Sequence, residues 1–170
     1  MVSAASSPPF LFSELTFSDL LDVRTAAAKA DPSRDADELV RRYAIDVPVM
    51  TPGAAHVVER RVTEPFIDRY NDEVPGGGLA VTVFFPFTGD VELFRVRPDS
   101  VRVPPGYARA TSDAVIINFI LPDQDEERLA STIARSAAEL VEILGYLRAD
   151  AEPANAALAR RLRALCVGAD

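Results

Sequence analysis

Nucleophile and zinc chemistry have few candidate residues here, because the chain contains one histidine, His56, and one cysteine, Cys166. A Cys–His pair acts as a nucleophile only when the side chains are within hydrogen-bond reach and a third group orients the base. A structural zinc site needs four ligands, mostly cysteine and histidine. We therefore expect no His/Cys zinc site within one chain and no resident cofactor. Cys166 is interpreted as a small helix residue.

Carboxylates are the remaining candidates for metal chemistry. Asp68, Asp72 and Glu73 lie in a predicted loop, and Asp90 and Glu92 flank a predicted turn. A nuclease of the Asp…Glu-x-Lys type also needs a lysine two residues beyond an acid, and the single lysine of the chain is remote in sequence. Turn formation and helix capping explain these acids as well. A carboxylate metal-dependent hydrolase using Asp68, Asp72 and Glu73 is kept as an alternative.

Phosphate and nucleic-acid binding are disfavoured by motif and by charge. Gly76-Gly77-Gly78 precedes a predicted strand, whereas a P-loop follows a strand and continues into Gly-Lys-Ser/Thr. The chain has 18 basic and 26 acidic residues, a formal net charge of −8. Proteins that bind phosphate backbones or anionic membranes need excess lysine and arginine. We expect neither nucleic acid nor membrane as a partner.

Composition predicts a folded domain in a reducing compartment. At 170 residues and 48% hydrophobic content, the chain is long enough for one sizeable core. We expect a flexible segment at 1–12 and a single domain at 13–170. The single cysteine and the lack of a signal-peptide pattern indicate the cytoplasm. Arginine and alanine are abundant and lysine is nearly absent, which is typical of a GC-rich bacterial genome.

The elements that must position any site are organised around one β-prone stretch, Gly76–Asp90. Leu79–Phe87 is predicted as the central strand, with alternate residues on one face. Pro86 lacks a backbone donor and predicts an edge or a bulge there. We expect Val91–Val96 to return as an antiparallel partner after the Thr-Gly-Asp turn. Two further strands are predicted at 56–64 and Ala114–Leu121, and a short extended piece at 101–103.

Helices are predicted before and after these strands in the sequence, and we expect them to cover one face of the sheet. A capping box of Thr16 and Asp19 begins a helix at about 17–30, and a second is expected at about 32–45. A third should run from an Asp123 cap to about 149, with Asp150 and Pro153 starting a fourth. The predicted fold is therefore α+β, with an N-terminal helical pair, an antiparallel β-meander of about four strands and a C-terminal helical hairpin.

A contact with another protein is the function that this pattern favours. We expect a non-catalytic subunit or adaptor, of which an acidic inhibitor or immunity-type protein is a variant. A second copy of the chain is another candidate partner. Leucines spaced by three and four, followed by arginines, predict the interface. These residues are Leu140, Leu144, Leu147, Arg160 and Arg161. Packing within the chain would produce the same leucine spacing.

A small-molecule sensor is the alternative from another class. Its pocket would lie between the sheet and the first C-terminal helix. The predicted lining residues are Phe84, Tyr107 and Asn118. Asn118 lies among apolar neighbours, and a buried amide requires hydrogen-bond partners.

Overall fold

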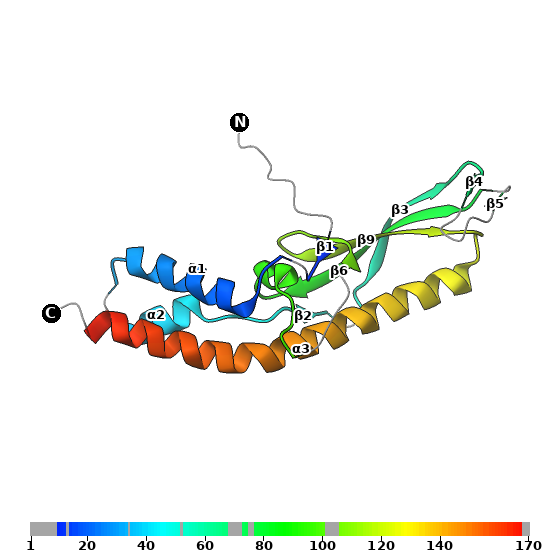
Figure 1. The fold of residues 1–170 in the computed structure, drawn as a ribbon. Helices are drawn as coiled ribbons and strands as arrows, with labels where there is room; N and C mark the ends of the chain where they lie inside the picture. The colour runs from blue at the N-terminus through cyan, green and yellow to red at the C-terminus, as the bar shows by residue number, and fades with distance from the viewer. Residues whose placement is uncertain are drawn as a thin grey trace, which may run out of the picture. The chain divides into compact units, whose positions relative to one another are not determined.

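The computed structural model describes residues 10–12, 14–33, 35–51, 53–67, 73–74, 77–100 and 106–167. Figure 1 shows their arrangement along the chain. The elements are β1 (Phe10–Leu11), α1 (Phe17–Ala30), α2 (Ala36–Tyr43), β2 (Val49–Met50), β3 (His56–Val62), β4 (Phe66–Ile67), β5 (Glu73–Val74), β6 (Leu79–Thr88), the 3₁₀ helix η1 (Val91–Arg95), β7 (Gly106–Tyr107), β8 (Arg109–Ala110), β9 (Ala114–Leu121) and α3 (Glu126–Val167). The predicted α+β class is confirmed, with N-terminal helices, an antiparallel sheet and a long C-terminal helix.

The chain packs as two compact units, which are described separately. Unit 1 is built mainly from Val49–Thr88 and Tyr107–Glu142, and contains the five-stranded sheet and the first half of α3. Unit 2 is built from Leu11–Pro48, Gly89–Gly106 and Ile143–Asp170. Two such units can belong to one folding domain, so the single-domain interpretation stays a prediction. The expected extended piece at 101–103 lies outside the described residues.

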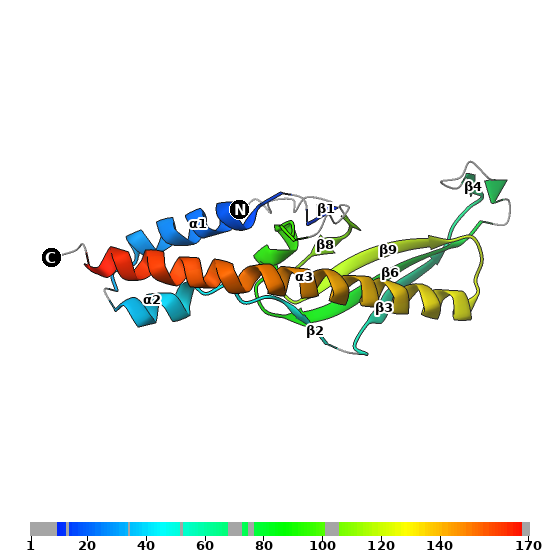
Figure 2. The same cartoon turned by 60° about the horizontal axis from the view of Figure 1, so that its bottom comes forward.

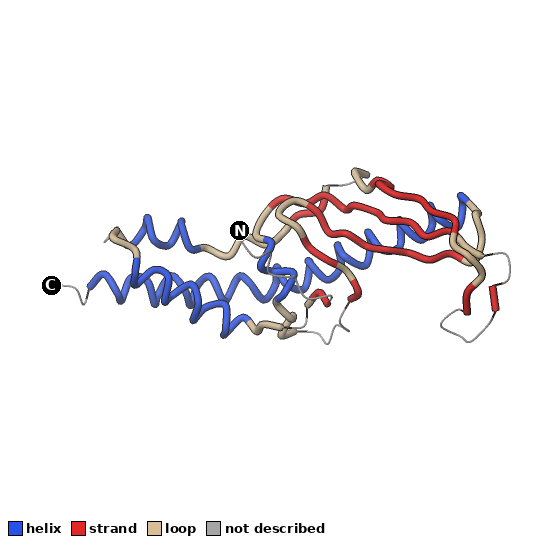
Figure 3. The backbone as a smooth tube through the Cα atoms, turned by 90° about the horizontal axis from the view of Figure 1, so that it is seen from above, coloured by secondary structure: helices blue, strands red, loops and turns tan. Residues whose placement is uncertain are grey.

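β6 is the central strand of unit 1. It pairs antiparallel with β9 from Leu79↔Leu121 to Pro86↔Ala114, and with β3 and β2 along its other side. These strands lie side by side in Figures 2 and 3. Alternate β6 side chains are buried, as the period of two predicts. The buried set is Leu79, Val81, Val83, Phe85 and Phe87.

Pro86 lies where pairing changes from one strand to another. β3 pairing with β6 reaches Phe84, and β2 pairing begins at Phe87. The missing N–H of Pro86 therefore falls in the gap between the β3 and β2 ladders, while Phe87 donates its own N–H to the carbonyl of Asp113. A proline is tolerated at such an interruption because no ladder bond is lost. Pro86 therefore lies on a central strand at a gap between two ladders, and not at the predicted edge or bulge.

Gly77 explains part of the glycine run before β6. Its φ is +69°, and a Cβ at this position would lie 2.0 Å from the carbonyl oxygen of Thr63. Thr63 in turn donates its N–H to the carbonyl of Gly78 at 2.8 Å and accepts the N–H of Gly78 on its side-chain oxygen. Only glycine allows both this backbone conformation and this close approach of the two chain segments.

The expected strand at Val91–Val96 is wrong, since Val91–Arg95 forms η1. The Asp90 carboxylate accepts the N–H of Glu92 at 3.0 Å and begins a helical turn. Leu93 and Phe94 are both fully buried. Two consecutive buried residues fit a tight helical turn better than the alternation of a half-exposed strand. The strand next to β6 is β9 instead, and β8 pairs with the outer side of β9.

The N-terminal helical pair lies in unit 2. α1 begins and ends at the predicted residues, and the Thr16–Asp19 capping box is present. α2 starts at Ala36 rather than near residue 32, because the Asp35 carboxylate accepts the N–H groups of Asp37 and Glu38. The predicted pair is confirmed, with a shorter second helix.

The C-terminal segment is one helix in place of the expected hairpin. α3 continues from Glu126 to Val167 with Pro153 inside it, as Figure 1 shows. Asp150 does not cap a new helix. Its carboxylate instead accepts the backbone N–H groups of Asp99 at 2.8 Å and Ser100 at 3.1 Å. At the start of α3 the capping carboxylate belongs to Asp125, which accepts the N–H of Glu127, rather than to Asp123.

Pro153 gives a test of helix continuity. Proline inside a helix removes a backbone hydrogen bond and crowds the preceding turn, at a cost of about 3 kcal/mol. We expect Pro153→Ala to raise the free energy of unfolding by about 1–3 kcal/mol, because an N–H is restored inside α3. Urea unfolding measures the change. Glu152→Ala, at the exposed neighbouring position, is the control and should stay within about 0.5 kcal/mol of wild type. A Pro153→Ala variant that is no more stable would contradict the continuous helix.

Candidate functional site

The candidate site is the face of the unit 1 sheet opposite the buried β6 residues, which we call the open face. Residues directly across from one another on antiparallel strands share a face, so the pairing registers define its members. These are His56, Glu59 and Arg61 on β3, Ala80, Thr82 and Phe84 on β6, and Ile116, Asn118 and Ile120 on β9. Most are exposed or half-buried, whereas Ile116 is buried.

Two contacts organise the middle of the open face. The rings of His56 and Phe84 are 5.9 Å apart at 52°, in line with their positions across β3 and β6. His56 Nδ1 lies 3.0 Å from the carbonyl oxygen of Ala54. Thr82 donates its hydroxyl to the Asn118 side-chain oxygen at 2.9 Å. Asn118 is therefore a hydrogen-bonded surface residue rather than a buried amide.

An exposed aliphatic side chain marks one end of the open face. Ile120 is 62% exposed and lies across from Ala80, which in turn lies across from Arg61. Ala80 is small, so it does not cover the isoleucine. A row of Arg61, Ala80 and Ile120 thus places a cation and an apolar side chain on one surface. A neighbouring row places Glu59 across from the Thr82–Asn118 pair.

The open face combines apolar, polar and charged side chains. Apolar groups surrounded by polar and charged side chains are the pattern of protein interfaces. The one titratable ring on the open face, His56, bonds a backbone carbonyl and contacts Phe84. Among the described residues, no group of three or more His, Cys, Asp or Glu side chains is placed to hold a metal ion.

The residues predicted for a ligand pocket lie on the open face. Phe84 and Asn118 occupy neighbouring rows there, and the side chain of Tyr107 lies outside the described part. The first half of α3 runs along the other side of β3, β6 and β9 (Figure 1). Arg60 lies across from the buried Val81 and binds Glu126 in the first turn of α3. The start of α3 therefore lies on the side of the sheet that carries the buried β6 residues. Phe84 and Asn118 therefore do not line a space between sheet and helix.

The predicted interface residues divide into buried leucines and exposed arginines. Leu140, Leu144 and Leu147 are 5%, 2% and 0% exposed. Arg160 and Arg161 are exposed, and Arg161 contacts Asp22 at 2.8 Å. The folded chain itself covers the leucines, so a partner would meet other residues of α3. The arginine part of the predicted interface stays a prediction.

The remaining candidates are dispersed. Asp68 and Asp72 lie outside the described residues, and of Glu73 only the backbone is described, in β5. Asp90 and Glu92 both bind Arg24 in unit 2. His56 lies on the open face of unit 1, whereas Cys166 is a half-buried residue in the last turn of α3 in unit 2.

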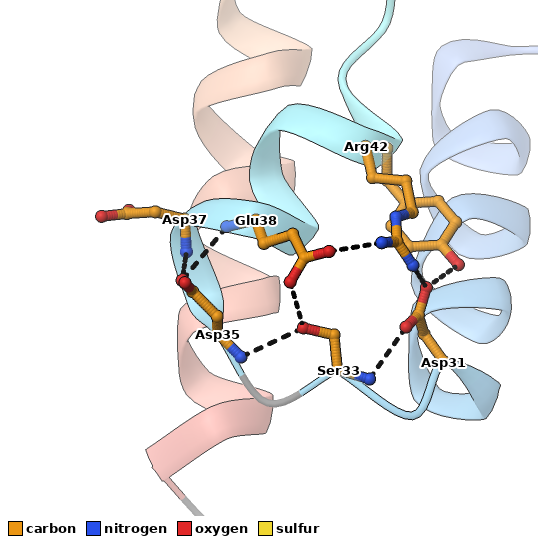
Figure 4. A network of polar contacts seen from close by, with 7 residues as sticks. Asp31, Ser33, Asp35, Asp37, Glu38 and Arg42 are labelled. Atoms are coloured by element: carbon orange, nitrogen blue, oxygen red, sulfur yellow. Dashed lines mark hydrogen bonds and ion pairs between the residues drawn. The ribbon is translucent and has the colours of Figure 1, made fainter.

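Unit 2 contains a polar cluster that the sequence did not predict, drawn in Figure 4. Its centre is Asp31, which is 7% exposed. The Asp31 carboxylate accepts the N–H of Ser33 at 2.9 Å, a guanidinium N–H of Arg42 at 2.7 Å and the hydroxyl of Tyr43 at 2.8 Å. Glu38 joins the cluster through Ser33 and Arg42. The cluster ties the end of α1 to α2.

Protonation in this cluster is shifted by its hydrogen bonds. The Ser33 N–H, then the Tyr43 hydroxyl and Arg42, lower the pKa of Asp31 against the opposing effect of burial. The hydrogen bond that Tyr43 donates to Asp31 raises the pKa of Tyr43, and the hydrogen bond that Arg42 donates to Asp31 raises the pKa of Arg42. All three groups therefore keep their ordinary neutral-pH charges. The cluster therefore holds α1 and α2 together and does not act as a proton-transfer site.

A second polar cluster surrounds Arg24 in unit 2. One guanidinium nitrogen binds Asp90 and also lies 3.1 Å from Glu92. The Arg24 and Asp90 side chains are 20% and 16% exposed. Within the described residues, the buried Nε of Arg24 has no hydrogen-bond partner. Since α1 supplies the arginine and the residues around η1 supply the acids, this cluster fastens those two segments.

Comparison of the chain with protein-family models, curated proteins and solved structures finds no match. In the part of the chain that the structure describes, none of the helices combines the length and apolar character needed to cross a membrane.

Asp31 generates a prediction about pH dependence. A carboxylate whose folded pKa is lowered below its ordinary value of about 3.9 binds fewer protons than in the unfolded chain. Its stabilisation is therefore present above about pH 4 and is lost as pH falls toward the folded pKa. We expect wild type to be more stable than Asp31→Asn at pH 7, with a smaller difference at about pH 3. Urea unfolding at several pH values measures this.

The matched control is Asp46→Asn, an exposed aspartate of unit 2. Its difference from wild type in the free energy of unfolding should be small. An Asp31→Asn variant with a pH-independent deficit would contradict the role given to the carboxylate charge.

Proposed function

We propose that this chain is a non-catalytic protein-binding subunit or adaptor that contacts its partner through the open face. The supporting observation is Ile120, a large aliphatic side chain left 62% exposed on β9, in the same row as Arg61 with only the small Ala80 between them. Exposed apolar patches that are rimmed by polar residues mark protein contact sites, and we infer that Ile120 and the neighbouring Ala80 supply the apolar part of such a patch. The partner would present an apolar residue to Ile120 and a carboxylate to Arg61.

The acidic-inhibitor variant rests on charge. A chain with a formal net charge of −8 attracts basic proteins over a range set by the Debye length, which is longest at low salt. This attraction speeds the encounter, while the apolar contact on the open face sets the lifetime of the complex. In the inhibitor variant, charge would therefore set how fast a basic partner is found, and the open face would set how long it stays bound.

The sensor hypothesis receives less support from this geometry. Small-molecule sites enclose most of the surface of their ligand. Asn118 lies at the surface and Phe84 contacts His56 on the open face. A metabolite bound there would remain largely in water.

Ile120 provides the test of the protein-binding proposal. The partner is first captured from host lysate on the tagged chain, and then purified and titrated. We expect Ile120→Glu to weaken binding at least about tenfold, because a charge replaces the apolar contact. Val141→Glu is the matched control, since Val141 is 55% exposed on α3 and lies off the open face. Circular dichroism checks that both variants fold.

Equal weakening by Ile120→Glu and Val141→Glu, or no weakening by Ile120→Glu, would contradict the assignment of the open face. A chain that captures no partner, and whose melting temperature responds to a metabolite library, would favour the sensor instead.

Salt dependence separates the adaptor from the acidic inhibitor. For a basic partner, we expect the association rate constant to fall about tenfold or more between about 0.02 M and about 0.3 M salt, with little change in dissociation. Stopped-flow or surface-based kinetics measures both rates. An association rate that does not vary with salt would leave an adaptor whose recognition is mainly apolar.

A further inference from the structure

β3 is an exposed edge strand. It pairs with β6 on one side, and no other described strand pairs with it. Its side chains are exposed along its length, apart from the half-buried Val57. Val58 is 46% and Val62 is 58% exposed. An edge of this length offers unpaired backbone donors and acceptors to another strand.

The outward-facing backbone groups of β3 follow from one hydrogen bond. Thr63 donates its N–H to Gly78 at 2.8 Å, so the backbone of Thr63 points toward β6. Because antiparallel residues alternate between the two edges of a strand, Arg61 also points toward β6. Arg60 and Val62 therefore direct their N–H and carbonyl groups away from the sheet.

We propose that β3 pairs antiparallel with β3 of a second copy around a two-fold axis at Arg60. Such a contact is isologous, so each side-chain pair occurs twice except at the axis. In this register Glu59 lies across from Arg61 of the second copy, on the open face. Val62 lies across from Val58 of the second copy, so the exposed valines of the two copies lie near one another. This inference does not depend on the proposed function.

The charges of β3 favour this register. Charged residues on an edge strand usually discourage pairing with another chain. Here the two-fold axis places Glu59 and Arg61 of opposite copies together, twice, and such cross-strand pairs are favourable. The charge pattern that would repel a random strand is complementary to its own copy.

Arg60 is the residue that faces itself across the axis. Two arginines directly opposite one another would repel. Each Arg60 binds Glu126 of its own chain, with Nη2 2.9 Å from Oε2, which offsets its charge. The bond from Arg60 lowers the pKa of Glu126, so Glu126 is ionised at neutral pH. The axis then holds two ion pairs rather than two free cations.

The irregularity in β3 lies at the end of the proposed pairing, outside the Glu59–Arg61 pairs. Val57 pairs with Val83 and Glu59 with Thr82, so Val58 is the extra residue of a bulge. A competing register centred on Val62 would extend beyond the end of β3 at Val62. The register centred on Arg60 stays within the strand.

The experiment measures the mass of the full chain in solution by sedimentation equilibrium. We expect wild type at about 100 μM to have twice the 18.4 kDa chain mass, since a dimer with a micromolar Kd is mostly formed there. Glu59→Arg places arginine across from arginine, and Arg61→Glu places glutamate across from glutamate. Each variant alone should dimerise at least about tenfold more weakly.

Mixing the two variants is the decisive measurement. In a mixed dimer, the side chain introduced by Glu59→Arg in one copy lies across from the side chain introduced by Arg61→Glu in the other. The unchanged Arg61 of the first copy lies across from the unchanged Glu59 of the second, so both pairs are again complementary. We expect the equimolar mixture to recover the dimer mass.

Arg109→Glu, a charge reversal at an exposed position on β8, is the control and should dimerise like wild type. Thermal melting shows that each variant is folded. A monomeric wild type at about 100 μM would overturn the proposal. So would single variants that dimerise like wild type, or a mixture that stays monomeric although both variants are folded. A dimer that is weakened equally by Arg109→Glu would place the contact elsewhere and overturn the assignment to β3.

Discussion

Burial of one side of β6 is the constraint on which unit 1 depends. β6 pairs with strands on both sides, so every residue position on it also sets the facing of a residue on β3 or β9. A shift of one residue would expose Val83 and Phe85, which are 0% and 1% exposed, and would bury Thr82. The same register leaves Phe84 and Ile120 on the open face. The register that buries the core residues therefore also determines which residues form the open face.

Strong local signals predicted the fold well. Leu79–Phe87 and Ala114–Leu121 are runs rich in β-branched and aromatic residues, and the pattern alone places both strands. Thr16 and Asp19 cap α1 through contacts three residues apart, so neighbouring sequence is sufficient to find them. In each case the deciding interactions are local.

Long-range contacts decided the elements that sequence reasoning missed. Asp150 looks like a helix cap, but its carboxylate is occupied by Asp99 and Ser100, about fifty residues earlier. α3 then continues through Pro153 despite the local cost. Val91–Arg95 has strand-like composition but forms a 3₁₀ turn with Leu93 buried. No local sequence pattern indicates a contact between residues that are so far apart in the chain.

The candidate site was only partly predictable. Phe84 and Asn118 stand out in the sequence, but the face they occupy depends on which side of β6 the first half of α3 covers. The exposure of Ile120 could not be predicted from the sequence, because isoleucine is among the residues that are most often buried in a core. Asp31 is recognisable from sequence only as a helix stop. Its contacts with Arg42 and Tyr43 require α2 to fold back beside α1.

The gap between the β2 and β3 ladders, opposite Pro86, affects how this chain can change over evolution. The segment between Met50 and His56 leaves β6 at one register and rejoins it at another, and each register is set by its own pairing with β6. Residues inserted into that segment would lengthen a surface loop, which costs little conformational entropy per doubling of length. Neither flanking ladder would slip. The chain can therefore acquire new surface at this site while the sheet remains unchanged.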